Sequence, residues 1–168
     1  MPRSFDIVTE SPASVEQIHA AFGREDYWLA RIEPGAAITT LDSLIVDGDG
    51  TVKVCVTQHV GRQLLPVPVA KLIPGGLKMV HSETWRPVGD RRVRGRVRIS
   101  ASPGLGSGGA EVWLAPVGNG SQLRCAVKVQ VKIPLLGGKL EQSIGDSLAE
   151  EAIPEMQRFT TKWIAEHA

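Results

Sequence analysis

The stretch GGKLEQSIGDSLAEEAIPEMQRFTTKWIAEHA, from Gly137 to Ala168, decides the fold of this chain. After the glycine pair, apolar residues recur at steps of three and four, which is the period of an amphipathic α-helix. The apolar stripe consists of Leu140, Ile144, Leu148, Ala152, Met156, Phe159 and Trp163. Pro154 lies inside this helix and removes one of its hydrogen bonds, so we expect a kink near residues 150–153.

The residues before this helix, from Ile38 to Ile133, have the alternation of short strands joined by turns. Asp47-Gly48-Asp49-Gly50 is the strongest turn signal, and it predicts a hairpin. In its second strand Val52, Val54 and Val56 share one face, which indicates that one face of the sheet is packed. A single long helix after antiparallel strands must bury its stripe against the sheet. Because such an arrangement often encloses a cavity, a small-molecule pocket is the leading hypothesis.

The N-terminal part predicts one more strand and two short helices. The strand covers about residues 4–9. Ser11 to Ser14 supplies capping residues for a first helix, which Gly23 ends. A second helix is expected over residues 24–32, where Glu33-Pro34-Gly35 stops it.

The segment GRQLLPVPVAKLIPGG, from Gly61 to Gly76, fits neither a strand nor an ordinary loop. Its three prolines exclude a central strand and an uninterrupted helix. Its aliphatic residues are too many for a solvated loop, so the segment must lean on the sheet rim, the helix, a ligand or a membrane surface. Two interpretations stay open: a loop that closes one end of the core, or a mobile lid over a pocket.

Two strands, Leu77 to Arg86 and Arg91 to Ser100, predict a second hairpin. The first strand places on one face Met79, His81, Glu83 and Trp85. The second has arginines at period two, and six of the twelve arginines lie between Arg86 and Arg98. Such a row is typical of the solvent face of a half-buried strand. The alternative is docking to anionic lipid head groups or to an acidic partner.

Glycine-rich turns separate the remaining strands. PGLGSGG, from Pro103 to Gly109, lacks the Lys-Ser ending and the following helix of a phosphate-binding loop. Strands are expected near residues 110–117 and 122–133, joined by a turn at Gly118-Asn119-Gly120. The second of these strands alternates regularly, which favours a position across the long helix.

Size and composition indicate one compact domain over residues 1–168. A chain of this length buries about 70% of its unfolded surface, which is ample for a core and a pocket. The 42% hydrophobic content and net charge of +1 are ordinary, and we expect no nucleic-acid partner. No apolar run has the length of a spanning helix or the form of a signal peptide, so we expect a cytoplasmic protein. Cys55, Cys125 and the four histidines match no metal or redox spacing, so we expect free thiols, no metal and no cofactor.

The order of these elements, with two sequence motifs, resembles the helix-grip fold of the START-like superfamily, also called SRPBCC. The motifs are CAVKVQVKIPLLGGKLEQSI, from Cys125 to Ile144, and Glu83-Thr84-Trp85 upstream. They are most similar to a bacterial branch of that superfamily. The resemblance implies an α+β fold, in which a strongly bent antiparallel sheet of about seven strands wraps around the C-terminal helix. In order along the chain it implies a strand, two short helices, six strands and the long helix.

The same resemblance implies a hydrophobic pocket between the sheet and the helix. We expect it to carry or sense a hydrophobic or amphipathic small molecule, such as a lipid or a polyketide, with transient contact to a membrane surface. The residues expected to line it are Val54, Val56, Leu65, Val67, Val69, Met79, His81, Glu83, Trp85, Val97, Cys125, Val127, Val129, Gly145, Leu148, Ala149, Ala152 and Met156. Because Gly145, Ala149 and Ala152 are small, we expect them to leave volume beside the sheet.

Two other functions stay open. A cyclase-like or aromatase-like enzyme would use His81 and Glu83, because a buried carboxylate beside an imidazole is suited to proton transfer. A partner-binding module would instead have a filled core and would use the arginine row or the apolar segment as its interface.

Overall fold

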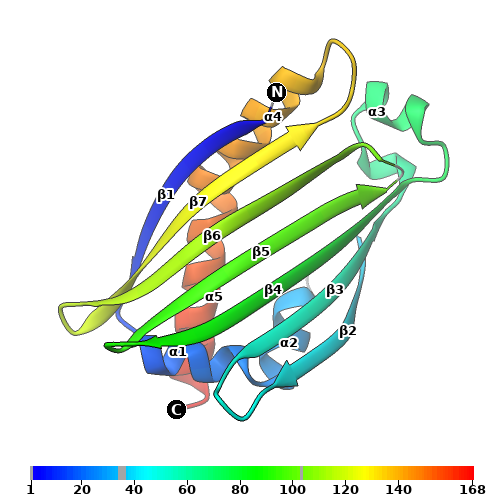
Figure 1. The fold of residues 1–168 in the computed structure, drawn as a ribbon. Coiled ribbons are helices and arrows are strands. Elements are labelled where there is room, and N and C mark those ends of the chain that lie inside the picture. Colours follow the sequence, from blue (N-terminus) through cyan, green and yellow to red (C-terminus); the bar gives the residue numbers. More distant parts are fainter. Residues whose placement is uncertain (1, 34–36, 103) are drawn as a thin grey trace.

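The computed structural model describes residues 2–33, 37–102 and 104–168, and in this part of the chain one antiparallel sheet wraps around a long C-terminal helix (Figure 1). The sheet has seven strands in the order β1-β7-β6-β5-β4-β3-β2. Their bounds are Arg3–Ser11 (β1), Ile38–Val46 (β2), Val52–Val60 (β3), Leu77–Gly89 (β4), Arg92–Ser102 (β5), Gly106–Val117 (β6) and Gly120–Val131 (β7). The predicted turn residues Pro34, Gly35 and Pro103 lie outside the described residues.

The helices lie close to the predicted positions, and the structure contains one further helix. Their bounds are Val15–Phe22 (α1), Glu25–Ile32 (α2), Val67–Leu72 (α3), Gly137–Ser147 (α4) and Ile153–Glu166 (α5). A π-helical segment, η2 (Leu148–Ala152), joins α4 to α5, and a short 3-10 turn, η1 (Arg62–Leu64), precedes α3. The addition is α3, which the sequence did not predict. The α+β helix-grip class is confirmed.

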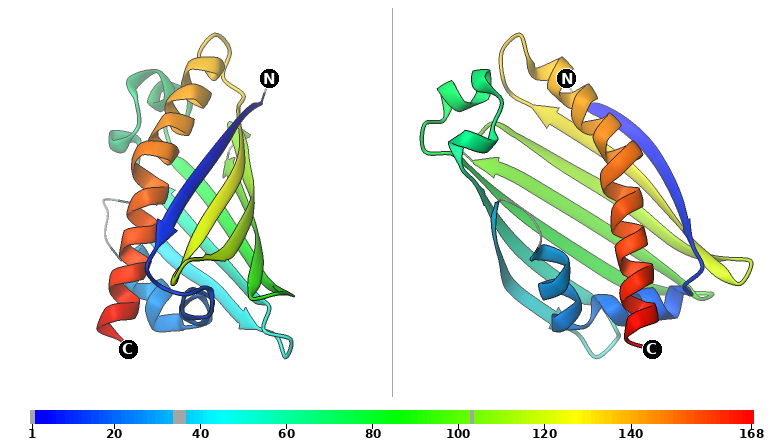
Figure 2. Two further views of the ribbon diagram at one scale, coloured as in Figure 1. Left: turned by 90° about the vertical axis from the view of Figure 1, so that its left-hand side faces the viewer. Right: turned by 180° about the vertical axis from the view of Figure 1, so that it is seen from behind.

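The first and the last strand of the chain are neighbours at one edge of the sheet. β1 pairs with β7 along its whole length, so that Ile7 lies opposite Cys125. The long helix packs on these same two strands. Figure 2 shows it along the β1–β7 side of the sheet, with α3 and α2 on the other side. The helix therefore covers one part of the concave face and not the rest.

The first helix closes one end of the sheet because its cap and its apolar face are both encoded locally. Ser14 Oγ accepts a hydrogen bond from the backbone N–H of Gln17 at 3.1 Å, and the Gln17 side chain accepts one from the backbone N–H of Ser14 at 2.9 Å. Val15, Ile18 and Phe22 are then buried on one side of α1.

Aromatic rings fill this end of the molecule. The Phe22 ring lies 4.7 Å from that of Trp85, and Tyr27 meets Trp163 edge to face at 5.3 Å. Gly95 lies opposite Trp85 on the neighbouring strand, and a Cβ at this position would come within 2.5 Å of the Trp85 ring. A glycine is therefore required for the ring to lie flat on β5.

The buried face of α4 differs from the predicted apolar stripe. Glu141 and Gly145 are buried, whereas Ile144 is 40% exposed. The Glu141 carboxylate accepts a hydrogen bond from the backbone N–H of Val131 at 2.8 Å, which gives this buried polar group a partner. Gly145 is in contact with the Phe5 ring, so the volume expected beside it is filled.

The kink predicted near residues 150–153 is present. The π-helical turn ends two residues before Pro154, whose missing N–H leaves one carbonyl of the preceding turn without its usual partner. Figure 2 shows the helix axis changing direction there, so that α5 follows the curve of the sheet.

The segment from Gly61 to Gly76 is a short helical cap, not an extended loop. Val69 and Ile73 are buried with Ile133 in a second apolar cluster, separate from the main core. Leu136 and Leu140, at the start of α4, pack against the same cluster. The segment thus links the strand ends of β3 and β4 to the long helix across the end of the molecule opposite α1.

Candidate functional site

One part of the concave face is covered neither by the long helix nor by α1 and α2. In the end of the sheet near α1, concave residues such as Trp85 and Leu114 are 2% exposed or less. Toward α3 the concave residues become half-exposed. We call these half-exposed residues the uncovered concave face; they are Met79, His81, Val97, Ile99, Gly108 and Ala110.

The register of the sheet brings these residues together. His81 on β4 lies opposite Ile99 on β5, which lies opposite Gly108 on β6. Directly opposite residues project from the same face of a sheet. A methyl group added to Gly108 would meet only the Lys128 carbonyl oxygen, at 3.5 Å, within a radius of 4 Å. Among the described residues no side chain comes within 4 Å of this methyl position, so the space directly above Gly108 is open.

A polar cluster closes this open face at its deep end. We define the polar cluster as Tyr27, Arg31, His81, Glu83 and Thr160. Glu83 is 3% exposed, and its carboxylate accepts a hydrogen bond from Trp85 Nε1 at 2.9 Å. Its other oxygen lies 2.5 Å from His81 Nε2 and 3.7 Å from Arg31 Nη2.

The environment of Glu83 keeps it ionised. Burial alone would raise the pKa of this carboxyl group. The positive charge of Arg31 and the hydrogen bonds from His81 and Trp85 outweigh burial and lower the pKa to about 2. Nearby, burial and the negative charge of Glu83 raise the pKa of the Cys125 thiol to about 11, so this thiol stays protonated.

The polar cluster ties α2 to α5 across the core. Tyr27 is fully buried, and its hydroxyl lies 2.7 Å from the hydroxyl of Thr160. Thr160 also donates a hydrogen bond to the Met156 carbonyl at 2.9 Å. Burial, the first of the causes, raises the pKa of Tyr27. The hydroxyl is therefore a neutral group that positions the two helices.

The predicted pocket residues divide into groups. Ten lie on the concave face of the sheet: Val54, Val56, Met79, His81, Glu83, Trp85, Val97, Cys125, Val127 and Val129. Leu148 and Met156 pack against the main core from the helix. Leu65 and Val69 belong to the second cluster. Val67 is 66% exposed, and Ala149 and Ala152 are exposed as well.

Arg31, Tyr27, Thr160 and Gly108 were missed by the sequence analysis. A signal was present for two of them. Tyr27 and Arg31 are four residues apart in α2 and therefore share one helix face, next to the apolar Trp28. The role of Gly108 depends on the register between β5 and β6, which no local pattern in the sequence fixes.

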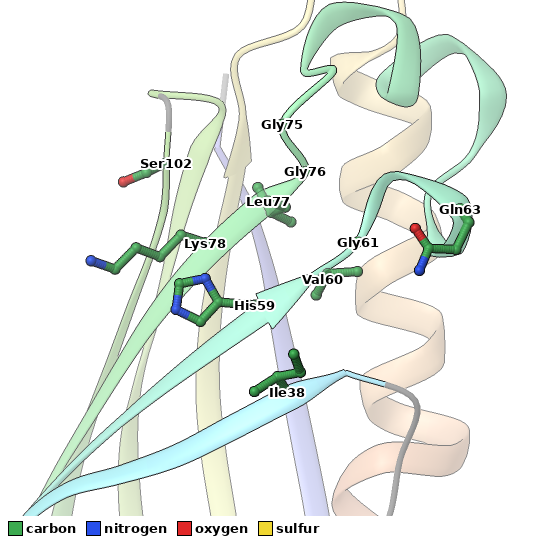
Figure 3. Close-up of a pocket in the computed structure, with 10 residues that line it drawn as sticks. All are labelled: Ile38, His59, Val60, Gly61, Gln63, Gly75, Gly76, Leu77, Lys78 and Ser102. Atoms are coloured by element: carbon green, nitrogen blue, oxygen red, sulfur yellow. The ribbon is translucent and has the colours of Figure 1, made fainter.

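Two hollows lie at the margins of the molecule. The first, of about 380 Å³, lies where β2, β3 and β4 end beside the helical cap; Figure 3 shows His59, Lys78 and Gln63 among the residues around it. The second, of about 350 Å³, lies between β1 and α5, where it is lined by Thr9 and Gln157 among others. Neither is lined by any of the predicted pocket residues.

The arginine row lies on the convex face, away from the polar cluster. Glu111 forms two ion pairs on this face: its Oε1 lies 2.9 Å from Arg96 Nε, and its Oε2 lies 3.5 Å from Arg94 Nη2. Trp113 is 37% exposed, and the guanidinium of Arg94 lies 4.8 Å from the centre of its ring. Arg124 lies on the same ring at 5.8 Å. This part of the convex face is therefore basic, and the exposed indole of Trp113 lies among its arginines.

The described residues contain no group of three or more His, Cys, Asp or Glu side chains that is suited to hold a metal ion. In the same ranges no helix is long and apolar enough to cross a membrane.

Comparisons with known proteins agree with this fold. An uncharacterized protein of Mycobacterium tuberculosis, Rv0481c, is 39% identical over an alignment of 175 positions, gaps included, that covers 98% of each chain. Among solved structures, a START superfamily protein from Mycobacterium smegmatis superposes with a TM-score of 0.55 at 12% identity, over 98% of this chain and 99% of the other. A norcoclaurine synthase mutant from Thalictrum, in complex with a transition-state analogue, gives 0.54 at 18% identity, over 99% and 96% of the two chains.

The likeness to these two solved structures shows the START-like fold alone, because the identities are low. A sequence-family model described as "Protein of unknown function (DUF2505)" matches residues 6–164, nearly the whole chain. This protein therefore belongs to the DUF2505 family and has a START-like helix-grip fold.

Proposed function

We propose that the protein binds a hydrophobic or amphipathic small molecule, such as a lipid or a polyketide, on the uncovered concave face between the sheet and the long helix. The observation that carries this proposal is the open space above Gly108, surrounded by half-exposed apolar side chains. Exposed apolar surface in a concave site is stabilised when a ligand removes it from water. Carriage and sensing both require this binding step.

A pair of leucine substitutions tests the position of the site. Gly108→Leu projects a side chain into the open space and should reduce the binding of the neutral dye Nile red at least about tenfold, because overlap of this kind costs more than about 1 kcal/mol. Ser107→Leu adds a similar side chain on the opposite, convex face and is the matched control. Equal dye affinity in the two variants would place the ligand elsewhere.

A proton-transfer enzyme is the second candidate, and the His81–Glu83 pair favours it. Because Glu83 is ionised, it orients the imidazole and does not itself supply a proton. The remaining ring nitrogen of His81, which is 29% exposed as a side chain, would then exchange the proton with a substrate.

Molecules retained during purification distinguish the two candidates. We would compare by native mass spectrometry the wild type and His81→Phe, both purified from the native host. A carrier retains the same molecule in both proteins. An enzyme of the cyclase or aromatase class that dehydrates the ring it closes retains in the variant an unreacted molecule, heavier than the product by one water, because ring closure alone leaves the mass unchanged.

As part of the same proposal, the basic convex face makes transient contact with an anionic membrane surface. Arg98, Arg124 and Lys128 are exposed on this face, Arg124 opposite Trp113 and the other two opposite Gly109, and such residues interact favourably with anionic head groups at low salt. Flotation with phosphatidylglycerol vesicles should recover the wild type but not Arg98→Glu/Arg124→Glu, and phosphatidylcholine vesicles should recover neither. Recovery of the charge-reversal variant at wild-type level would refute this contact.

A further inference from the structure

Arg31 is a buried cation whose hydrogen-bonding capacity is largely unused. Its Nη1 atom is buried and has no hydrogen-bond partner among the described residues. Its Nη2 atom lies 3.0 Å from the Met156 sulfur and 3.7 Å from Glu83, the latter beyond hydrogen-bond length. A thioether is a weak acceptor, and a guanidinium presents five N–H donors. Buried donors are rarely left without a partner, so this arrangement requires an explanation.

Within the polar cluster the Tyr27 hydroxyl also interacts with the Arg31 side chain, but no atom of the described residues is a hydrogen-bond partner of Nη1. Glu83 already has short contacts with His81 and Trp85. The hydroxyls of Tyr27 and Thr160 are close to each other, at 2.7 Å. Arg31 is instead held by its flat contact with the Trp28 ring, 4.6 Å from the ring centre. The guanidinium is thus positioned by packing while its donors stay available.

The position of Arg31 connects it to the open site. Its Nη2 atom lies 3.7 Å from the Glu83 oxygen that also contacts His81, and His81 lies opposite Ile99 on the uncovered concave face, so the guanidinium is next to the deep end of that face. Met156, which stands against the guanidinium, is an unbranched side chain that changes rotamer easily. An oxygen acceptor can therefore take the place of its sulfur without movement of the backbone.

We propose that the ligand is an amphipathic carboxylate, whose carboxylate accepts hydrogen bonds from Arg31 and whose apolar chain lies over Val97, Ile99 and Gly108. This inference rests on the proposed function and adds the chemical class of the ligand. A carboxylate matches the fork of donors that a guanidinium presents, and charge-assisted hydrogen bonds of this kind are the strong ones. The apolar chain then points from the deep end toward the helical cap, which closes the other end of the site.

Three ligands of equal chain length test this class. Dodecanoate, dodecanol and dodecyltrimethylammonium would compete with Nile red below their micelle-forming concentrations. We expect dodecanoate to bind at least about tenfold more tightly than dodecanol, in line with the worth of a hydrogen bond to a charged group. We expect the cation to bind most weakly of the three.

Two variants test the role of Arg31. Arg31→Met keeps the length and the contact with Trp28 but removes the donors, so the preference for dodecanoate over dodecanol should disappear. Glu83→Gln removes the negative charge beside the guanidinium and should raise the affinity for dodecanoate several-fold, with that for dodecanol unchanged. Arg31→Met leaves Glu83 without its counter-ion and could fail to fold for that reason. In that case the double variant Arg31→Met/Glu83→Gln, in which neither side chain is charged, is used in its place.

The outcomes separate this inference from the function on which it rests. Equal affinity for dodecanoate and dodecanol would overturn the carboxylate assignment and would leave the proposed function intact. A water molecule would then be the partner of Arg31. A preference for dodecanoate that survives in both Arg31 variants would overturn the assignment to Arg31. Failure of all three ligands and of Nile red to bind would overturn the proposed function itself.

Discussion

A single buried carboxylate, Glu83, should dominate the acid sensitivity of this protein. Its pKa falls from 4.5 to about 2 on folding. A lowered folded-state pKa adds stability that is fully present above pH 4.5 and is lost as the pH falls toward 2. We expect Glu83→Gln to lose stability at neutral pH, by an amount on the order of 3 kcal/mol at most. Urea unfolding measures the free energy of unfolding at each pH. Between pH 2 and pH 5 this free energy should change less with pH in the variant than in the wild type.

A surface carboxylate provides the control for this prediction. The hydrogen bond with Arg91, the largest cause, lowers the pKa of Glu16 to about 2 as well, but Glu16 is exposed to solvent. Salt screens such a pair. In molar salt Glu16→Gln should therefore keep the acid dependence of the wild type. If the free energy of unfolding of Glu83→Gln depended on pH as strongly as that of the wild type, the buried cluster would contribute nothing to acid unfolding.

Gly95 carries a second prediction at the scale of one residue. Gly95→Ala brings a methyl group within 2.5 Å of the buried Trp85 ring, which is held in place by Phe22. We expect a loss of about 1–3 kcal/mol in the free energy of unfolding, the usual cost of overpacking. Gly48→Ala is the control, because its methyl group meets nothing within 4 Å. Chemical denaturation of the two variants measures the difference, and equal stabilities would mean that Trp85 moves aside freely.

Among the elements, the helical cap from Gly61 to Gly76, which contains α3, is the one whose stability should be separable from the rest. Its buried residues Val69 and Ile73 belong to the second cluster, not to the main core. We expect Val69→Ser to speed hydrogen exchange in α3 and at the start of α4, while the exchange of the central strands is unchanged. Leu72→Ser, at a position 55% exposed, should change neither. Faster exchange throughout the sheet in Val69→Ser would show that the cap is part of the core.

The elements also show how far sequence patterns reach. Alternation and turn residues predicted most of each strand because each pattern is local and repeated over nine to thirteen residues. The start of β6 was wrong, since residues 106–109 were predicted as part of a turn and lie in the strand. The helix α3 was missed because its three flanking and internal prolines exclude a long helix but permit one short turn with Pro68 near its start. The prediction of which face of α4 is buried was wrong because the Glu141 side chain has a hydrogen-bond partner in the backbone of β7. Hydrophobic periodicity carries no information on such a partner.

At the scale of the whole molecule, the fold was predictable and the polar cluster was not. One long amphipathic helix after a run of strands leaves few arrangements that bury its apolar face. His81 and Glu83 could be placed together because they are two residues apart on one strand. Arg31 reaches Glu83 from α2, and Thr160 on α5 contacts Tyr27, so only the tertiary structure decides which of these atoms meet. Long-range contacts of this kind leave no mark on local sequence.

Because the sheet and the long helix both border the proposed site, ligand binding should stabilise the entire 168-residue chain. A ligand present at a hundred times its dissociation constant adds about 2.7 kcal/mol to the free energy of unfolding. For a domain of this size about 2–4 °C of melting temperature corresponds to 1 kcal/mol, so we expect a rise of roughly 5–10 °C with dodecanoate. Differential scanning calorimetry should show this rise in the wild type and in Ser107→Leu, and little or none in Gly108→Leu. A rise of equal size in Gly108→Leu would locate the binding away from the concave face, since the added leucine occupies the space in which the ligand must lie.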